Sequence, residues 1–219
     1  MKSRLSATFV FAALAGTFAL STAAVAADAG HARVRAVYVA HLTPMNAAVV
    51  GSKTTGVARF EIRGSELVID IKVRGAPPDI THWQHFHGFK DGRSATCATP
   101  SADKKGDGIV DLIETEPASG TTMVPFDDAP AEMDIAHGVY PKASADGSYT
   151  YHKVVPLKTL RAQFAKAFGT RKIDLDRRVV YIHGVPATTK LPSTVASLGP
   201  SPARVTLPIA CGSIELVHR

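Results

Sequence analysis

The sequence has few cysteines, no blocks of like charge and no long apolar run beyond its N-terminal segment. Lys and Arg outnumber Asp and Glu by 25 to 19, but they are scattered along the chain. We therefore expect no nucleic-acid partner, while the formal net charge of +6 favours a weak attraction for small anions. The lack of a second long apolar run excludes a membrane-spanning helix beyond the N-terminal segment.

The N-terminal segment, residues 1–26, has the pattern of a secretory signal peptide. Lys2 and Arg4 precede an apolar run, which ends in small residues. The pattern predicts cleavage after Ala26 or Ala27, and export with the periplasm as the expected location. A retained membrane anchor is the alternative, which the absence of a following basic cluster disfavours.

The exported part, residues 27–219, contains both cysteines. An oxidising compartment favours disulfides, and Cys97 with Cys211 is the only internal pairing. About 190 residues suffice for one domain with a substantial core and fall short of two ordinary ones. We expect a single domain.

Alternating apolar and charged residues predict a β-hairpin in residues 57–74. Phe60 and Ile62 point away from the charged residues between them, and the alternation resumes at Leu67 after Gly64 and Ser65. Such a pattern is typical of a hairpin with one solvated face.

Other segments complete an all-β pattern with one short helix. Strands are expected at residues 32–41, 148–155, 178–183 and 205–217, the last one kinked at Pro208. A helix is expected at residues 157–169, packed on the sheet by the apolar stripe Leu157, Leu160, Phe164 and Phe168, with Gly169 as its C-terminal cap. After Cys97 the chain loses periodicity, so a long loop is expected at residues 99–137.

Three histidines with HxxHxH spacing lie in the segment THWQHFHGFKDGRSATC, residues 81–97. On an extended strand, His85 and His87 share one face and Phe86 points to the other. Two imidazoles on one face form a ready pair of metal ligands, whereas His82 is expected to anchor backbone. The alternative is a pair of histidines on a solvent-facing edge.

Residues 103–114 partly match the calcium-loop pattern DxDxDG with a glutamate at the twelfth position. The candidate ligands are Asp103, Asp107, Ile109, Asp111 and Glu114. Lys105 replaces the ligand at position three and adds a positive charge, so calcium affinity is expected to be weak. The alternative is a surface turn rich in Asp and Gly.

Three motifs in order resemble those of the copper/zinc superoxide dismutases. HWQHFHGFKDG followed by Cys97 resembles the family's HGFHVHEFGD followed by a cysteine. RVVYIH, ending at His183, resembles a strand ending in VVH, and LPIACGSIEL, which contains Cys211, resembles ACGVIGI. The resemblance covers residues 56–219 unevenly. It implies a Greek-key β-barrel or sandwich of superoxide dismutase type, to which the helix and the long loop are additions.

The resemblance also implies site residues. His85, His87 and His183 would be copper ligands, His82 a structural histidine, and Cys97 and Cys211 a disulfide. Imidazole suits both copper oxidation states, and three protein ligands leave an open position for a small anion such as superoxide.

Two departures weaken the enzymatic expectation. Asp103 stands where the family has a histidine that bridges copper and zinc, and no run of zinc ligands follows. Pro208 stands where the family has an active-site arginine, for which Arg204 is the nearest substitute. We therefore expect no zinc in the family's usual subsite, and weak or absent superoxide dismutation.

Other functions fit the same residues. The chain would equally suit a non-enzymatic protein that sequesters or delivers copper or zinc, or a chordin-type domain that keeps the fold without the enzyme. Three histidines also hold zinc in some hydrolases, although no proton shuttle can be named here. The plainest interpretation is a barrel with a buried core histidine at 183. His137 is a further candidate ligand, and the oligomeric state is open.

Overall fold

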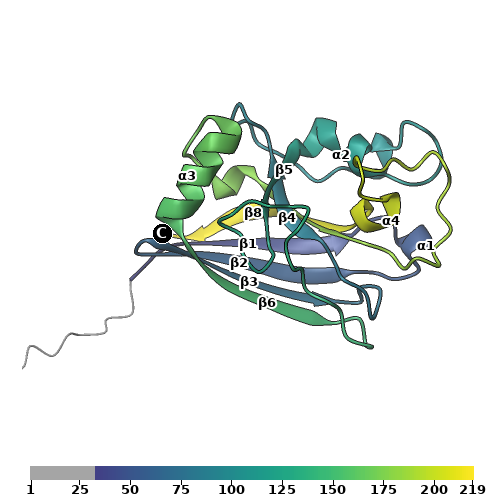
Figure 1. Ribbon diagram of the computed structural model, residues 1–219, viewed down its shortest axis with the longest axis horizontal. Helices are drawn as coiled ribbons and strands as arrows, with labels where there is room; N and C mark the ends of the chain where they lie inside the picture. Colours follow the sequence, from purple (N-terminus) through teal and green to yellow (C-terminus); the bar gives the residue numbers. More distant parts are fainter. Residues whose placement is uncertain (1–32) are drawn as a thin grey trace, which may run out of the picture. The chain divides into compact units, whose positions relative to one another are not determined.

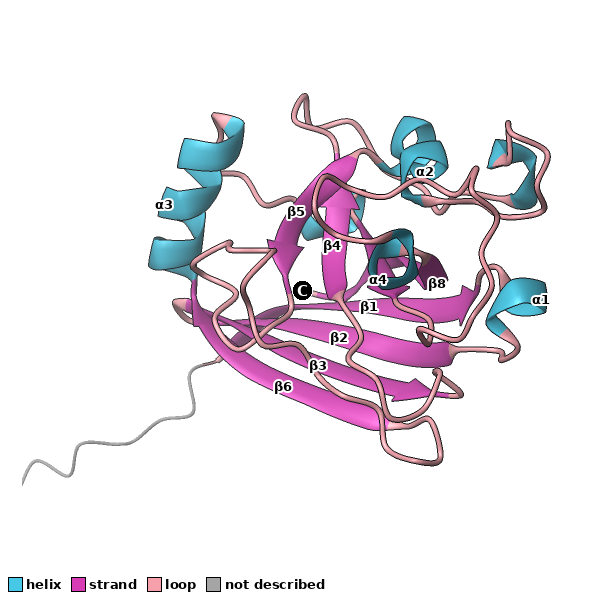
Figure 2. Ribbon diagram, turned by 45° about the vertical axis from the view of Figure 1, so that its right-hand side comes forward, coloured by secondary structure: helices cyan, strands magenta, loops and turns pink. Residues whose placement is uncertain are grey.

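A single curled sheet of eight antiparallel strands dominates the protein (Figures 1 and 2). The computed structural model describes residues 33–219, so the expected signal peptide lies outside the described residues. The strand order is β5-β4-β7-β8-β1-β2-β3-β6. In Figure 2, β4 and β5 cross the direction of β1, β2, β3 and β6, which shows how strongly the sheet curls into a half-barrel. The expected all-β fold class is confirmed, and the structure has several short helices where the sequence predicted one.

Four long strands form one half of the sheet: β1 (Val34–Pro44), β2 (Thr55–Arg63), β3 (Glu66–Arg74) and β6 (Tyr149–Pro156). β2 and β3 pair without a register shift from Thr55↔Arg74 to Arg63↔Glu66, across a two-residue turn in which Gly64 has a φ of 53°. The predicted hairpin is confirmed. Inner residues such as Phe60 and Ile69 are fully buried, and the outer face carries charged residues.

Four strands form the other half: β4 (Gln84–Gly88), β5 (Thr121–Pro125), β7 (Val179–His183) and β8 (Pro208–His218). Every residue of β4 and β7 is buried. Their inner face packs on the main core through Phe86, Val180 and Ile182, and their outer face lies beneath connecting segments. The two halves of the sheet therefore differ, because connecting segments cover the outer face of β4 and β7 and leave that of the long strands open.

Aromatic residues join the two halves across the core. The ring centroid of Phe126, just after β5, lies 5.6 Å from that of Phe60 on β2 and 5.9 Å from that of Phe86 on β4. The hydroxyl of Tyr151 on β6 donates to the carbonyl of Asp127 at 2.8 Å. These contacts hold the two edges of the curled sheet over one shared core.

The predicted helix is confirmed as α3 (Leu157–Phe168). Leu157, Leu160 and Phe164 are buried, and Gly169 ends the helix with a φ of 74°, a left-handed conformation that glycine adopts at little cost. In Figure 1, α3 lies at one end of the sheet. The remaining helical segments are short: α1 (Ala47–Val50), α2 (Leu112–Ser119), α4 (Ala203–Thr206), and the 3₁₀ turns η1 (Pro100–Ala102) and η2 (Leu175–Arg177).

Two segments differ from expectation. The expected loop 99–137 contains α2 and β5, and the expected strand from residue 205 begins with the helical turn α4, so that β8 starts only at Pro208. The buried residues of α2 are polar, namely Glu114, Thr115 and Ser119, so its sequence shows no apolar stripe. A capping box between Asp111 and Glu114 stabilises its first turn instead.

The predicted disulfide is confirmed. Cys97 and Cys211 are bonded with a Cα–Cα distance of 5.9 Å, and no free cysteine occurs in residues 33–219. The bond ties the segment after β4 to β8, and it suits an oxidising, extracytoplasmic location. Within the same range, the helices are all too short or too polar to cross a bilayer.

Candidate metal centre

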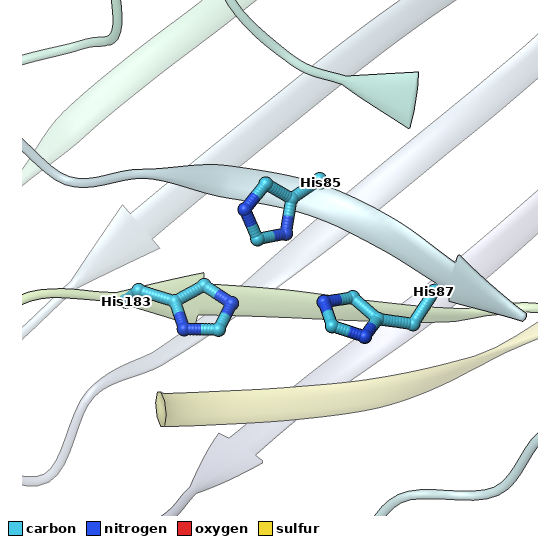
Figure 3. A group of neighbouring side chains, drawn as sticks. All are labelled: His85, His87 and His183. Atoms are coloured by element: carbon cyan, nitrogen blue, oxygen red, sulfur yellow. The ribbon is translucent and has the colours of Figure 1, made fainter. Parts of the chain in front are cut away.

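Three buried imidazoles meet on the outer face of β4 and β7. His85 and His87 project from β4 and His183 from the end of β7, and Figure 3 shows their rings turned toward one another. Each ring offers a nitrogen within 4.8 Å of those of the other two. The ring centroids of His85 lie 4.6 Å from His183 and 5.1 Å from His87. The structure thus brings together the three histidines that were predicted from the sequence as metal ligands.

Strand register explains why the three rings meet. β4 and β7 pair antiparallel with Tyr181 opposite His85, and the amide of His183 donates to the carbonyl of Trp83 at 2.8 Å. His183, two residues beyond Tyr181, is therefore a diagonal neighbour of His85 on the same face. The alternate residues Phe86 and Ile182 point into the main core. Side chains on one face of β4 and β7 thus anchor the strands in the core, and those on the other face form the histidine cluster.

Hydrogen bonds orient two of the rings. Nδ1 of His183 lies 2.7 Å from the carbonyl oxygen of Thr206, to which it donates, so its lone pair is on Nε2. Nδ1 of His87 lies 3.3 Å from the carbonyl oxygen of Gly120, while its Nε2 lies 3.1 Å from the hydroxyl of Thr122. Backbone carbonyls in such positions fix the tautomer of metal-binding histidines.

Unpaired buried nitrogens concentrate in this cluster. In residues 33–219, three buried side-chain polar atoms lack a hydrogen-bond partner: Ser52 Oγ, His85 Nδ1 and His183 Nε2. Leaving a buried polar atom unpaired costs about 1–3 kcal/mol. Two of these atoms belong to the histidine cluster, where a bound ion would give them a partner.

Burial keeps the three imidazoles neutral. Desolvation, assisted by the neighbouring histidines, lowers the pKa of His85 well below its usual value. Burial likewise lowers the pKa of His87 to about 3 and that of His183 to about 4. Only neutral imidazole has a lone pair for a metal, so the site is in its binding form at neutral pH.

The donor set fits a transition-metal ion. Metal–imidazole bonds are about 2.0–2.1 Å long, so nitrogens up to 4.8 Å apart need to draw together by roughly an ångström. Three imidazoles with no fourth protein ligand leave a coordination position open. The arrangement could therefore hold a metal ion and present it to a further ligand.

His82 lies outside the cluster. It is fully buried, and its Nδ1 and Nε2 each lie 2.9 Å from a backbone carbonyl oxygen, those of His183 and Pro77 respectively. Its ring stacks on Tyr149, with centroids 5.8 Å apart. The side chain therefore braces the backbone at the end of β7. His137 is exposed, and its ring contacts Asp134.

The carboxylates of the calcium-like loop are engaged within the protein. Asp103 accepts the backbone N–H groups of Gly106, Asp107 and Gly108. Asp111 caps α2 and forms an ion pair with Lys105. The Lys105 ammonium thus places beside Asp111 the positive charge that a calcium ion would supply.

Glu114, at the twelfth position, accepts the backbone N–H groups of Lys104 and Lys105. Asp107 accepts the amide of Ile109 and the hydroxyl of Thr194. Calcium binding at this loop stays a prediction.

A cavity of about 330 Å³ opens onto the histidine cluster. His85 and His183 form part of its wall, together with apolar side chains that include Trp83, Leu112 and Ile135. Neither Asp103 nor Arg204 lines it, and Arg204 is exposed. The open side of the candidate metal site therefore faces an apolar space.

Sequence reasoning missed the groups that orient the rings. The carbonyls of Gly120 and Thr206 carry no signature, because every residue has a carbonyl, and both lie in segments without apolar periodicity. Thr122, in the short strand β5, offers only a hydroxyl among many in the chain. Its contact with His87 follows from the pairing of β5 with β4.

No protein-family model matches this chain, and no curated protein matches its sequence. The likeness to copper/zinc superoxide dismutases therefore rests on the three motifs and on the converging histidines. What the chain itself contains is a curled antiparallel sheet with a disulfide and a buried three-histidine cluster.

Proposed function

We propose that the protein is an exported copper-binding protein that holds the ion through His85, His87 and His183. The observation that carries the proposal is the convergence of three buried, neutral imidazoles, two of which have unpaired nitrogens. The cost of burying these nitrogens is offset when an ion binds.

Copper is favoured by the donor set. Both cysteines are in the disulfide, and the cluster contains no carboxylate, so the ligands are imidazoles alone. Imidazole binds copper, zinc and nickel, and affinity among the divalent ions is greatest for copper. Zinc is the second candidate, but a hydrolytic zinc site needs a base for its water, and no Asp or Glu lines the described cavity wall.

The surroundings of the site support binding more than fast dismutation. A bound copper ion would supply one-electron redox chemistry, and the protein would hold it between neutral ligands. No Lys or Arg lines the cavity in the described part of the chain, so the wall adds no attraction for superoxide beyond that of the ion. We expect weak or no dismutation, and a role in copper sequestration or delivery is the alternative within the same site. A chordin-type structural domain would need no metal.

The test is copper titration of the purified mature protein. Copper(II) should bind at one equivalent and give an electron paramagnetic resonance spectrum with nitrogen hyperfine structure. His85→Ala should weaken binding at least 100-fold. The matched control is His152→Ala, which removes an exposed histidine that pairs with Asp70 on β3.

Unchanged copper affinity in His85→Ala would refute the proposal. A superoxide assay on the copper-loaded protein then separates enzyme from binder. A second titration with zinc, in competition with copper, decides which ion the site prefers.

A further inference from the structure

We infer that the open side of the metal site binds a small organic molecule with one coordinating atom and an apolar body, which lies in the cavity beside His85 and His183. The inference rests on the proposed function in so far as the coordinating atom meets the metal. The cavity and its lining are features of the protein alone. A ligand of this class differs from a bare inorganic anion, which would fill the coordination position and leave the cavity empty.

The size of the cavity carries the first step. At about 330 Å³ it lies at the lower end of the range for small-molecule sites, roughly 300–1,000 Å³. Superoxide has two atoms and would use a small part of this space. A ligand that filled it would have an apolar body of several carbons beyond its coordinating atom.

The lining carries the second step. Side chains from four separate segments form the wall: Trp83 from the approach to β4, Leu112 from α2, Ile135 from the loop after β5, and Leu198 and Pro200 from the segment before α4. No charged side chain of residues 33–219 is among the lining residues. Such a wall favours a ligand with apolar surface, because each Å² of that surface removed from water contributes about 25 cal/mol to binding.

The placement of polar groups carries the third step. The histidines that reach the cavity, His85 and His183, are 3% and 1% exposed, and each has an unpaired buried nitrogen. The other residues of the wall with a polar group in the side chain are Trp83, Thr122, Ser201 and Thr206, all of them uncharged. The polar end of a ligand is therefore directed to the histidine cluster and its apolar end to the remainder of the cavity.

The first experiment compares pyridine, 4-propylpyridine and azide on the copper-loaded protein, followed by the d–d absorption band. Each buried methylene is worth about 0.8 kcal/mol, so 4-propylpyridine should bind at least tenfold more tightly than pyridine. Equal affinities for the two pyridines would overturn the inference, because the alkyl chain would then remain in solvent.

Two variants test whether the gain comes from this cavity. Ile135→Trp should fill the space and reduce the tenfold preference to twofold or less, while azide affinity changes by less than threefold. Leu198→Ala should reduce the preference for 4-propylpyridine at least twofold. Because the Leu198 side chain is 45% exposed, this variant should still fold. The matched control is Val139→Trp, on the same loop as Ile135 but outside the cavity wall, and it should preserve the preference.

A metal-free measurement separates this inference from the proposed function. Trp83 is the single tryptophan of the chain and lines the cavity, so its fluorescence reports on occupancy. Propylbenzene, which has no coordinating atom, should change this fluorescence saturably in the metal-free protein and in His85→Ala. No change in either protein would refute the cavity as a ligand site even if copper binds. A saturable change without copper binding would refute the proposed function and leave the cavity as a site for apolar molecules.

Discussion

The two halves of the sheet bury their strands in different ways. The long strands β1, β2, β3 and β6 bury one face and expose the other to solvent, whereas β4 and β7 are buried on both faces. The solvent-exposed face of the long strands is unsuited to a metal site, because water there would stabilise protonated imidazoles and would compete for the metal. A second covered face provides a low-dielectric layer in which unpaired nitrogens and lowered pKa values persist. The candidate metal centre therefore lies in the half that contains β4 and β7.

The cover over β4 and β7 depends on a few tethers. The amide of Ala95 donates to the carbonyl of Arg177 at 3.0 Å, and that of Ala98 donates to the Tyr181 hydroxyl at 3.1 Å. The disulfide from Cys97 to Cys211 adds a covalent tether to β8. Removing these tethers should expose the outer face of β4 and β7 to solvent, as the outer face of the long strands already is.

The largest expected effect follows removal of the disulfide in Cys97→Ala/Cys211→Ala. The bond closes a loop with a sequence separation of 114, for which the chain-entropy model gives a loss of up to about 5 kcal/mol in the free energy of unfolding. Denaturant titration measures this loss. Hydrogen exchange should accelerate more at the amides of β4 and β7 than at those of β2 and β3, and copper affinity should fall before the fold is lost. Copper affinity and exchange rates equal to those of the unmodified protein would contradict this.

A smaller effect is expected from truncating the core within the long strands. Phe60→Ala should lower the free energy of unfolding by about 3–5 kcal/mol, because Phe60 is fully buried against Phe126. Val57→Ala on the same strand should change it by less than about 0.5 kcal/mol, since Val57 is 40% exposed. Similar losses in the two variants, measured by denaturant titration, would show that β2 buries both faces.

The smallest effect is the contribution of a single histidine to the pH dependence of stability. His85, His87 and His183 stay neutral in the fold but protonate near pH 6.5 when the chain unfolds, so the unfolded state binds more protons below that pH. The metal-free protein should therefore have its full stability above pH 6.5 and lose stability as the pH falls toward 4.

His85→Ala removes one of these groups. Its stability should fall less steeply between pH 6 and 5, because one group fewer takes up a proton when the chain unfolds. Denaturant titration of both metal-free proteins at several pH values gives the two slopes. Identical slopes would mean that the His85 ring is already solvated in the folded protein.

How much could be predicted from the sequence differs between the halves. The hairpin of β2 and β3 was predictable because alternation against solvent marks every second residue, as Phe60 and Arg59 illustrate. Helix α3 was predictable from its apolar stripe and Gly169. In contrast, α2 and β5 were missed, since α2 buries polar residues and has no apolar stripe, and β5 is a strand of only five residues.

The candidate site was predictable in its ligands but not in its setting. The HxH spacing put His85 and His87 on one face of a strand, and the motif resemblance added His183. The Thr206 and Gly120 carbonyls, the Thr122 hydroxyl and the cavity wall come from segments that have no pattern in common. Their meeting depends on how the chain returns over β4 and β7.

The sequence by itself determined the alternation of the long strands, the one amphipathic helix, the cysteine pair and the two histidines that share a face of β4. These features are local, or follow from there being a single cysteine pair. Only the tertiary structure decided that His183 reaches the other two, that one nitrogen each of His85 and His183 is buried without a partner, and that the open side of the cluster faces an apolar cavity. Strand register and the covering segments place these groups together, and such long-range packing has no periodic trace in the order of residues.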